Sequence, residues 1–220
     1  MSQTRGDLRT LVLSWLDDPN GTYFTAPQVN VWLNNAQREL QKLLINQGEN
    51  YYVQRMSGTL VDGTDTYILP TDFKKSHKLE VVVSGTGVTE QRQTLSPVTY
   101  MQLDQIAQVS GVPSVVCFKR NAMIVRPIPD DSYTVYLHQS YQVADMTSDS
   151  DIPDVPQDYS EYIAVLATID GFMKDQRPPS EFILGKKTTY EKTLLADSEK
   201  RDVSAPRMVV SFESGYGPIF

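Results

Sequence analysis

The sequence is poor in the residues from which most catalytic and metal sites are built. Its 220 residues include one cysteine and two histidines. Cys117 cannot form an internal disulfide, and the motifs GxGxxG, GKS, GKT, HExxH and CxxC do not occur. We therefore expect neither an enzyme nor a bound cofactor or metal ion.

Basic residues are in the minority, since 20 lysines and arginines face 27 aspartates and glutamates and give a net charge of -7. Such a surface is poorly suited to neutralising nucleic-acid phosphates or anionic lipids, so nearby DNA should not be held tightly. No apolar run approaches the roughly 18 residues that span a bilayer. The first ten residues, MSQTRGDLRT, lack the apolar core of a signal peptide. We expect a reduced protein made in the cytoplasm, with no membrane association.

Helical periodicity is present towards both ends of the chain. Between residues 6 and 17 the apolar residues recur at helical spacing: Leu8, Leu11, Val12, Trp15 and Leu16. Thr25 can cap a second helix with Pro27 in its first turn, and that helix has one apolar stripe: Val29, Leu33, Ala36, Leu40 and Leu43. These two patterns predict a helical hairpin.

Helical spacing returns near Val155 and continues, after a break at Pro178 and Pro179, from about residue 180 to residue 201. The third helix has a clear apolar stripe: Tyr159, Tyr162, Ile163, Leu166, Ile169 and Met173. The fourth has a weaker apolar face: Phe182, Ile183, Tyr190 and Leu194. The sequence therefore predicts two further helices.

The middle of the chain alternates between apolar and polar residues and is interrupted by turn signals. Four of these signals can turn hairpins: Asp62-Gly63, residues 84–87, Arg120-Asn121 and residues 129–131. By usual strand lengths the segment should contain five to seven strands. Ser96 as N-cap, with Pro97 in the first helical position, predicts one short helix among them.

Together these patterns predict an α+β fold, with a helical bundle formed by both ends of the chain. Residues 1–50 and 155–202 should form that bundle. Residues 51–154 should form an inserted β-rich domain with one short helix, and residues 203–220 an extended C-terminal arm.

The few residues with reactive side chains have structural explanations. Cys117 lies in an alternating strand pattern, where a buried and inert thiol is expected. His138 should lie on the strand face opposite Val135 and Leu137, towards solvent or an interface. His77 follows two lysines, whose charge disfavours a role as proton acceptor.

The stretch DMTSDSDIPDVPQD offers four carboxylates as possible calcium ligands: Asp145, Asp149, Asp151 and Asp154. Counted from Asp149, the sixth position of a calcium loop is not glycine, and Ser160 occupies the position of the bidentate glutamate. We therefore interpret the stretch as a solvated linker that precedes a helix.

Five segments, taken in order, resemble the head-to-tail adaptor proteins of tailed bacteriophages, also called connectors or tail tubular protein A-like proteins. The segments are VNVWLNNAQRELQKLL (29–44), YILPTDF (67–73), LSPVTYMQL (95–103), VRPIPDDSYTVYL (125–137) and PQDYSEYIAVLATI (156–169). The resemblance extends from about Leu8 to Arg201.

The resemblance implies a structural virion protein without catalytic activity. Adaptors of this family have a helical bundle that carries a β-rich domain, and they form a dodecameric ring beneath the portal. The implied partners are the portal protein, neighbouring copies in the ring, and tail or nozzle proteins. Genomic DNA would pass through the ring without specific binding. The implied location is the head-tail interface of the virion, after assembly in the host cytoplasm.

The last residues correspond by position to an arm with which adaptors of this family reach the portal. Ordering these residues costs about 1 to 2 kcal/mol of backbone conformational entropy each, while burial of an apolar side chain stabilises by only about 2 to 3 kcal/mol. The arm therefore needs a preformed partner groove or strand edge. The predicted portal contacts are Met208, Val209, Val210, Phe212, Tyr216 and Phe220. The alternative is that the arm packs on its own subunit.

The exposed strand edges of the β-rich domain should be covered by neighbouring subunits or tail proteins, with Tyr136 and His138 as the predicted contacts. Two other functions remain open at this point. One is a different tail-completion or baseplate component. The other is a virion-borne cell-wall hydrolase, for which Asp151 and Glu161 are the only candidate acid pair.

Overall fold

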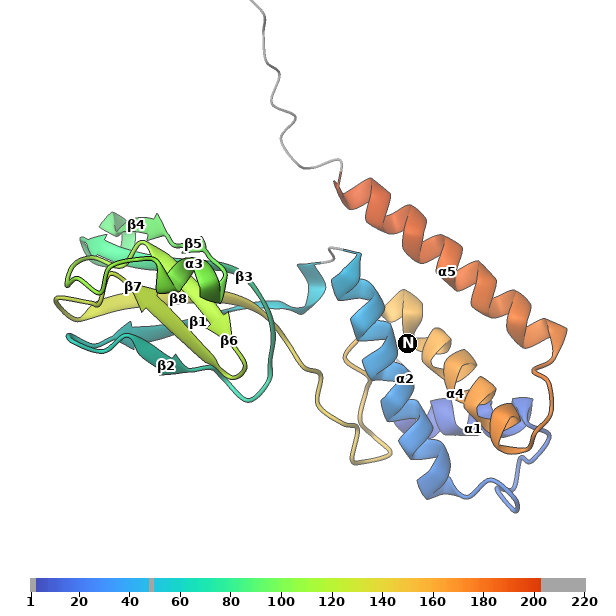
Figure 1. Cartoon of the computed structure of the whole chain (residues 1–220). Helices are drawn as coiled ribbons and strands as arrows, with labels where there is room; N and C mark the ends of the chain where they lie inside the picture. The colour runs from blue at the N-terminus through green and yellow to red at the C-terminus, as the bar shows by residue number, and fades with distance from the viewer. Residues whose placement is uncertain (1–2, 48–49, 203–220) are drawn as a thin grey trace, which may run out of the picture.

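The computed structural model describes residues 3–47 and 50–202. Helices from both ends of the chain lie together, and the strands form a separate unit beside them (Figure 1). The long helices are α1 (Arg5–Trp15), α2 (Ala26–Asn46), α4 (Ser160–Lys174) and α5 (Glu181–Asp202). The predicted α+β fold, with helices at both ends and strands inserted between them, is therefore confirmed. The predicted C-terminal arm lies outside the described residues.

The first two helices begin at capping boxes. Thr4 and Asp7 exchange hydrogen bonds at the start of α1, and Thr25 and Gln28 do so at the start of α2. Between the two helices, the carboxylate of Asp18 accepts hydrogen bonds from three consecutive backbone N–H groups, which shapes the turn. The helical hairpin predicted from the sequence is present.

Helix α4 is the centre of the helical unit, and α1, α2 and α5 all pack against it. Most of its residues are buried, including Ala164, Ala167 and Thr168, which the predicted stripe did not contain. A Cβ atom at Gly171 would come within 2.6 Å of Leu16, so glycine allows α1 and α4 to approach closely here. The stripe prediction was wrong for Met173, which is 68% exposed.

The strands form two four-stranded sheets that share one hydrophobic core. The first sheet has the order β1 (Val53–Leu60), β8 (Tyr133–Tyr141), β3 (Phe73–Ser84) and β4 (Gln91–Thr94). The second has the order β2 (Thr66–Ile68), β7 (Ala122–Arg126), β6 (Val115–Lys119) and β5 (Ser96–Pro97). Leu79 and Leu137 from the first sheet meet Val116 and Val125 from the second in that core.

Two of the four predicted hairpins are present, at residues 84–87 and at Arg120-Asn121. The turns at Asp62-Gly63 and at residues 129–131 instead connect strands that belong to different sheets. Eight strands are described, one more than the upper expected number.

The prediction of a helix capped by Ser96 was wrong. Ser96 and Pro97 form strand β5, which pairs in parallel with β6, and the short helix α3 (Tyr100–Asp104) begins three residues later behind Thr99. Thr99 and Gln102 form its capping box.

The chain returns from β8 to the helices through residues 142–156, which we term the strap. Three apolar residues of the strap are buried in the helical core: Val143, Met146 and Val155. Three amide side chains of α2 bind the backbone of this region, at Tyr141 and along the strap: Asn34, Gln37 and Gln41. Short 3-10 turns at Asn50–Tyr52, Gly87–Thr89 and Gln157–Tyr159 complete the described structure.

The carboxylates that resembled calcium ligands hold the strap in place. Asp149 forms ion pairs with Arg5 at 2.7 Å and with Arg9 at 2.6 Å, and these contacts hold the pKa of Asp149 far below its ordinary value. Asp145 pairs with Arg38. These carboxylates have structural partners, and no group of metal-binding side chains occurs within residues 3–47 and 50–202.

Candidate interaction surfaces

The six residues predicted to contact the portal lie outside the described residues. The two residues predicted to contact neighbouring subunits or the tail, Tyr136 and His138, both lie on β8. They are half-buried and share the outer face of the first sheet, whereas Val135 and Leu137 are buried in the core. The strand alternation therefore predicted correctly which face each residue occupies.

Two arginines enclose the ring of Tyr136. The guanidinium carbons of Arg55 on β1 and Arg92 on β4 each lie 4.5 Å from the ring centroid, at a distance typical of cation-π contacts. The Tyr136 hydroxyl donates a hydrogen bond to Glu90 Oε1 at 3.0 Å. Arg92 also forms an ion pair with Glu90, at 2.7 Å. Glu90 therefore fixes both the Tyr136 hydroxyl and the Arg92 guanidinium that lies against the ring.

His138 belongs to the same charged surface. Its Nε2 lies 3.2 Å from Glu80 Oε2, and Lys78 Nζ lies 2.6 Å from Glu80 Oε1. The hydrogen bond from Lys78, followed by that from His138, lowers the pKa of Glu80. Glu80 is therefore an ionised carboxylate at neutral pH, between two basic groups.

We refer to Arg55, Lys78, Glu80, Arg92, Tyr136 and His138 as the outer-face cluster. Its side chains are already ordered by mutual contacts. Binding of a partner would therefore cost little further side-chain conformational entropy. Arginine and tyrosine are the residues most enriched where proteins contact each other. The cluster is suited to binding a polar protein surface. Sequence patterns could place Tyr136 on this face, but not the arginines contributed by other strands.

A second surface lies where the helical unit meets the first sheet. A cleft of about 630 Å³ is bounded by α2 and the start of β3. Its basic lining residues are Arg38, Lys42, Lys74 and Lys75, and Glu39 is its acidic one. We call this the basic cleft. The sequence shows Lys74 and Lys75 next to each other, but nothing in it indicates that α2 adds two further basic residues beside them.

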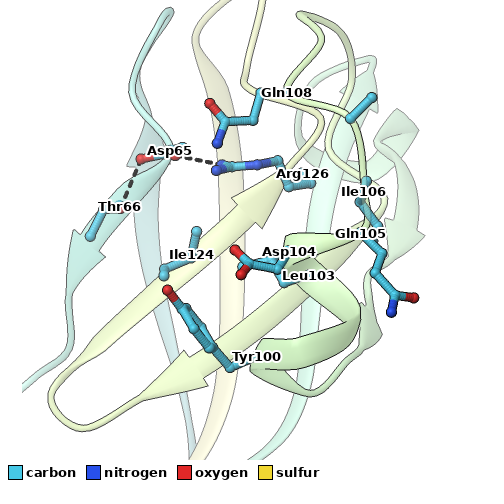
Figure 2. Close-up of a pocket in the computed structure, with 11 residues that line it drawn as sticks. Asp65, Thr66, Tyr100, Leu103, Asp104, Gln105, Ile106, Gln108, Ile124 and Arg126 are labelled. Carbon is cyan, nitrogen blue, oxygen red and sulfur yellow. Dashed lines mark hydrogen bonds and ion pairs between the residues drawn. The ribbon is translucent and has the colours of Figure 1, made fainter.

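A smaller pocket of about 420 Å³ lies beside the second sheet, between β2, β7 and the residues around α3. Figure 2 shows Arg126 and Asp65 joined across one wall, with Tyr100, Asp104 and Gln108 around the opening. Burial alone would raise the pKa of Asp65, but a hydrogen bond from Thr66 and the ion pair with Arg126 together lower it. The described lining contains no histidine or cysteine, and Cys117 is buried elsewhere.

The candidate acid pair of a hydrolase is engaged in separate structural contacts. Asp151 accepts backbone hydrogen bonds from Thr147 and Ser148, which lower its pKa. Glu161 accepts hydrogen bonds from Lys186 and Tyr190, and the bond from Lys186 is the main cause of its lowered pKa. A general acid of a glycosidase requires a raised pKa, so neither carboxyl is prepared for that role.

No helix in the described ranges is both long enough and apolar enough to cross a membrane. In a comparison with protein-family models, the model of the SU10 adaptor protein family matches residues 3–209 of the chain. No match is found among curated proteins.

Proposed function

Because the chain belongs to the SU10 adaptor protein family, a family of bacteriophage head-to-tail adaptors, we propose that it is a subunit of the ring that joins the portal of the phage head to the tail. The observation that supports this most is the extent of the family match, which includes both the helical and the β-rich unit. The ring is a dodecamer and lines the conduit through which DNA enters and leaves. The subunit performs no catalysis.

The charge of the subunit fits a conduit. A net charge of -7, repeated around a ring, repels DNA phosphates and favours passage over retention. The strap and its arginine contacts join the two units of the subunit at α1 and α2. A subunit held together in this way keeps its shape while DNA moves past it.

The portal contact is assigned to the C-terminal residues Met208, Val209, Val210, Phe212, Tyr216 and Phe220. Their apolar character suits a groove or strand edge on a partner that is already folded. The outer-face cluster, with Tyr136 and His138, is assigned to a neighbouring subunit or to a tail protein. Its ordered charged side chains support that assignment.

Deleting Met208–Phe220 tests the portal contact. Attachment to filled heads should be abolished, while the melting temperature should stay nearly unchanged, because the deleted residues would bind a partner and not their own subunit. A fall in melting temperature of more than about 5 °C would instead show that the segment packs on its own subunit. A cryo-electron-microscopy map of the particle distinguishes an adaptor from a baseplate component, since only the adaptor contacts the portal.

A further inference from the structure

We propose that the basic cleft of one subunit binds an acidic loop pair of the neighbouring subunit. The two loops carry Asp62 and Asp130-Asp131, and we call these three aspartates the acidic tip. This inference rests on the proposed ring and specifies the contact between its subunits. Tyr136 and His138 then remain available for the tail.

The basic cleft contains positive charge that its own chain does not neutralise. Arg38 is paired with Asp145, but Lys42, Lys74 and Lys75 form no ion pair within the described part of the chain. All three lysines are exposed. In a protein with a net charge of -7, three unpaired lysines around one cleft indicate an acidic partner.

The acidic tip provides the complementary charge. Asp62 lies in the loop after β1 and Asp130 and Asp131 lie in the loop before β8, and all three are exposed. The two loops are joined by a backbone hydrogen bond of 2.9 Å from Gly63 N–H to the carbonyl of Pro129. The tip therefore presents three carboxylates from a fixed pair of loops.

The two surfaces lie at opposite ends of the first sheet. Pairing of Leu60 with Tyr133 places the acidic tip at one end of β8, and pairing of Phe73 with Tyr141 places Lys74 and Lys75 at the other. The nine residues of β8 span about 26 to 30 Å. One subunit cannot bring both surfaces together, whereas adjacent subunits can. A contact between two different surfaces of identical chains is the type that closes into rings.

Several features favour this occupant over DNA. Glu39 lies in the lining of the cleft, and the C-terminal end of α2, with its partial negative charge, is beside it. They leave the cleft with only a small excess of positive charge. A few carboxylates can balance that excess, whereas a continuous run of phosphates would exceed it.

Cysteine cross-linking within assembled particles tests the contact. The chain's own Cys117 is only 2% exposed, so a short bismaleimide should react with introduced cysteines alone. A chain carrying both Lys75→Cys and Asp131→Cys should give a ladder of products that extends beyond the dimer. Each single variant should give no ladder. The sites are too far apart for a short linker within one subunit.

If the double variant is present on particles and gives no ladder, the inference is wrong. Absence of the unmodified chain from particles would contradict the proposed function instead, so the two failures are distinguishable.

Charge reversal provides an independent test. Lys75→Glu and Asp131→Lys should each reduce incorporation into particles by about tenfold, because each places like charges opposite one another. Combining them should restore incorporation. Lys192→Glu makes the same charge change at an exposed position of α5 and serves as the matched control. Failure of the combined variant to recover would overturn the inference. So would binding of a short DNA duplex that Lys75→Glu abolishes.

Discussion

Among single residues, Asp170 on α4 is an ionisable group whose charge is disfavoured in the native state. It forms no hydrogen bond or ion pair within the described part of the chain, and the carboxylate of Glu39 is near it. Burial, and then the charge of Glu39, raise the pKa of Asp170 above its ordinary value of 3.8. The native state therefore holds the proton more tightly than the unfolded chain does. This favourable contribution is complete below pH 3.8 and is lost as the pH rises through the raised pKa.

Asp170→Asn should accordingly stabilise the protein at neutral pH. We expect the melting temperature to rise by about 1 to 3 °C at pH 7.5, and the gain over the parent chain to disappear near pH 3. Asp62→Asn, at an exposed site, is the control and should have no such effect. Scanning calorimetry at both pH values checks this. A gain that is equal at the two pH values would exclude the titration of Asp170 as its cause.

Tyr136 tests whether the outer-face cluster serves assembly or folding. Tyr136→Ala removes the ring from between Arg55 and Arg92, which should lower the free energy of unfolding by no more than about 2 kcal/mol. Incorporation into particles should fall by more than that loss of stability explains. Tyr136→Phe keeps the arginine contacts and loses only the hydrogen bond to Glu90, so its effect should be smaller. Equal losses of stability and incorporation would instead indicate a packing role.

Among the elements, the strap depends on polar contacts for its position on α2. Gln41 is 2% exposed; its amide donates to the carbonyl of Tyr141 and accepts from the N–H of Val143. Gln41→Met should leave both backbone groups without partners and lower the free energy of unfolding by about 1 to 3 kcal/mol in a urea titration. Gln105→Met, at an exposed position after α3, is the matched control. A loss below about 0.5 kcal/mol would mean that water replaces the amide.

The helices and strands differ in how far they could be predicted from the sequence. Local patterns predicted the four long helices and two of the hairpins, because caps, apolar stripes and turn residues act over a few positions. Ser96 was misinterpreted because its neighbour in space, Val115, is remote in the sequence. The basic cleft was missed for the same reason. It requires α2 and β3 to lie side by side, and the spacing of lysines along the chain does not indicate that.

At the scale of the whole molecule, the described surface has little that would hold a ring together in isolation. Large exposed apolar side chains are scattered over separate elements: Ile68, Val88, Met101, Met173 and Phe182. Contacts between exposed charges are weak and screened by salt. We therefore expect a monomer or weak oligomer at micromolar concentration, and a ring only on the portal. Light scattering checks this, and a stable dodecamer of the purified protein would contradict it.

The β-rich unit is attached to the helices through a narrow neck, because the chain enters along β1 and leaves along β8. Val53 and Ser140, near the two crossing points, are directly opposite one another in the sheet. After an exchange of genetic material between related phages, a new β-rich unit would have to fit the helical unit at this pair of neighbouring residues, along the strap, and where β3 lies beside α2. The β-rich unit could thus be replaced as one piece, with a different outer face, while the helices were inherited unchanged.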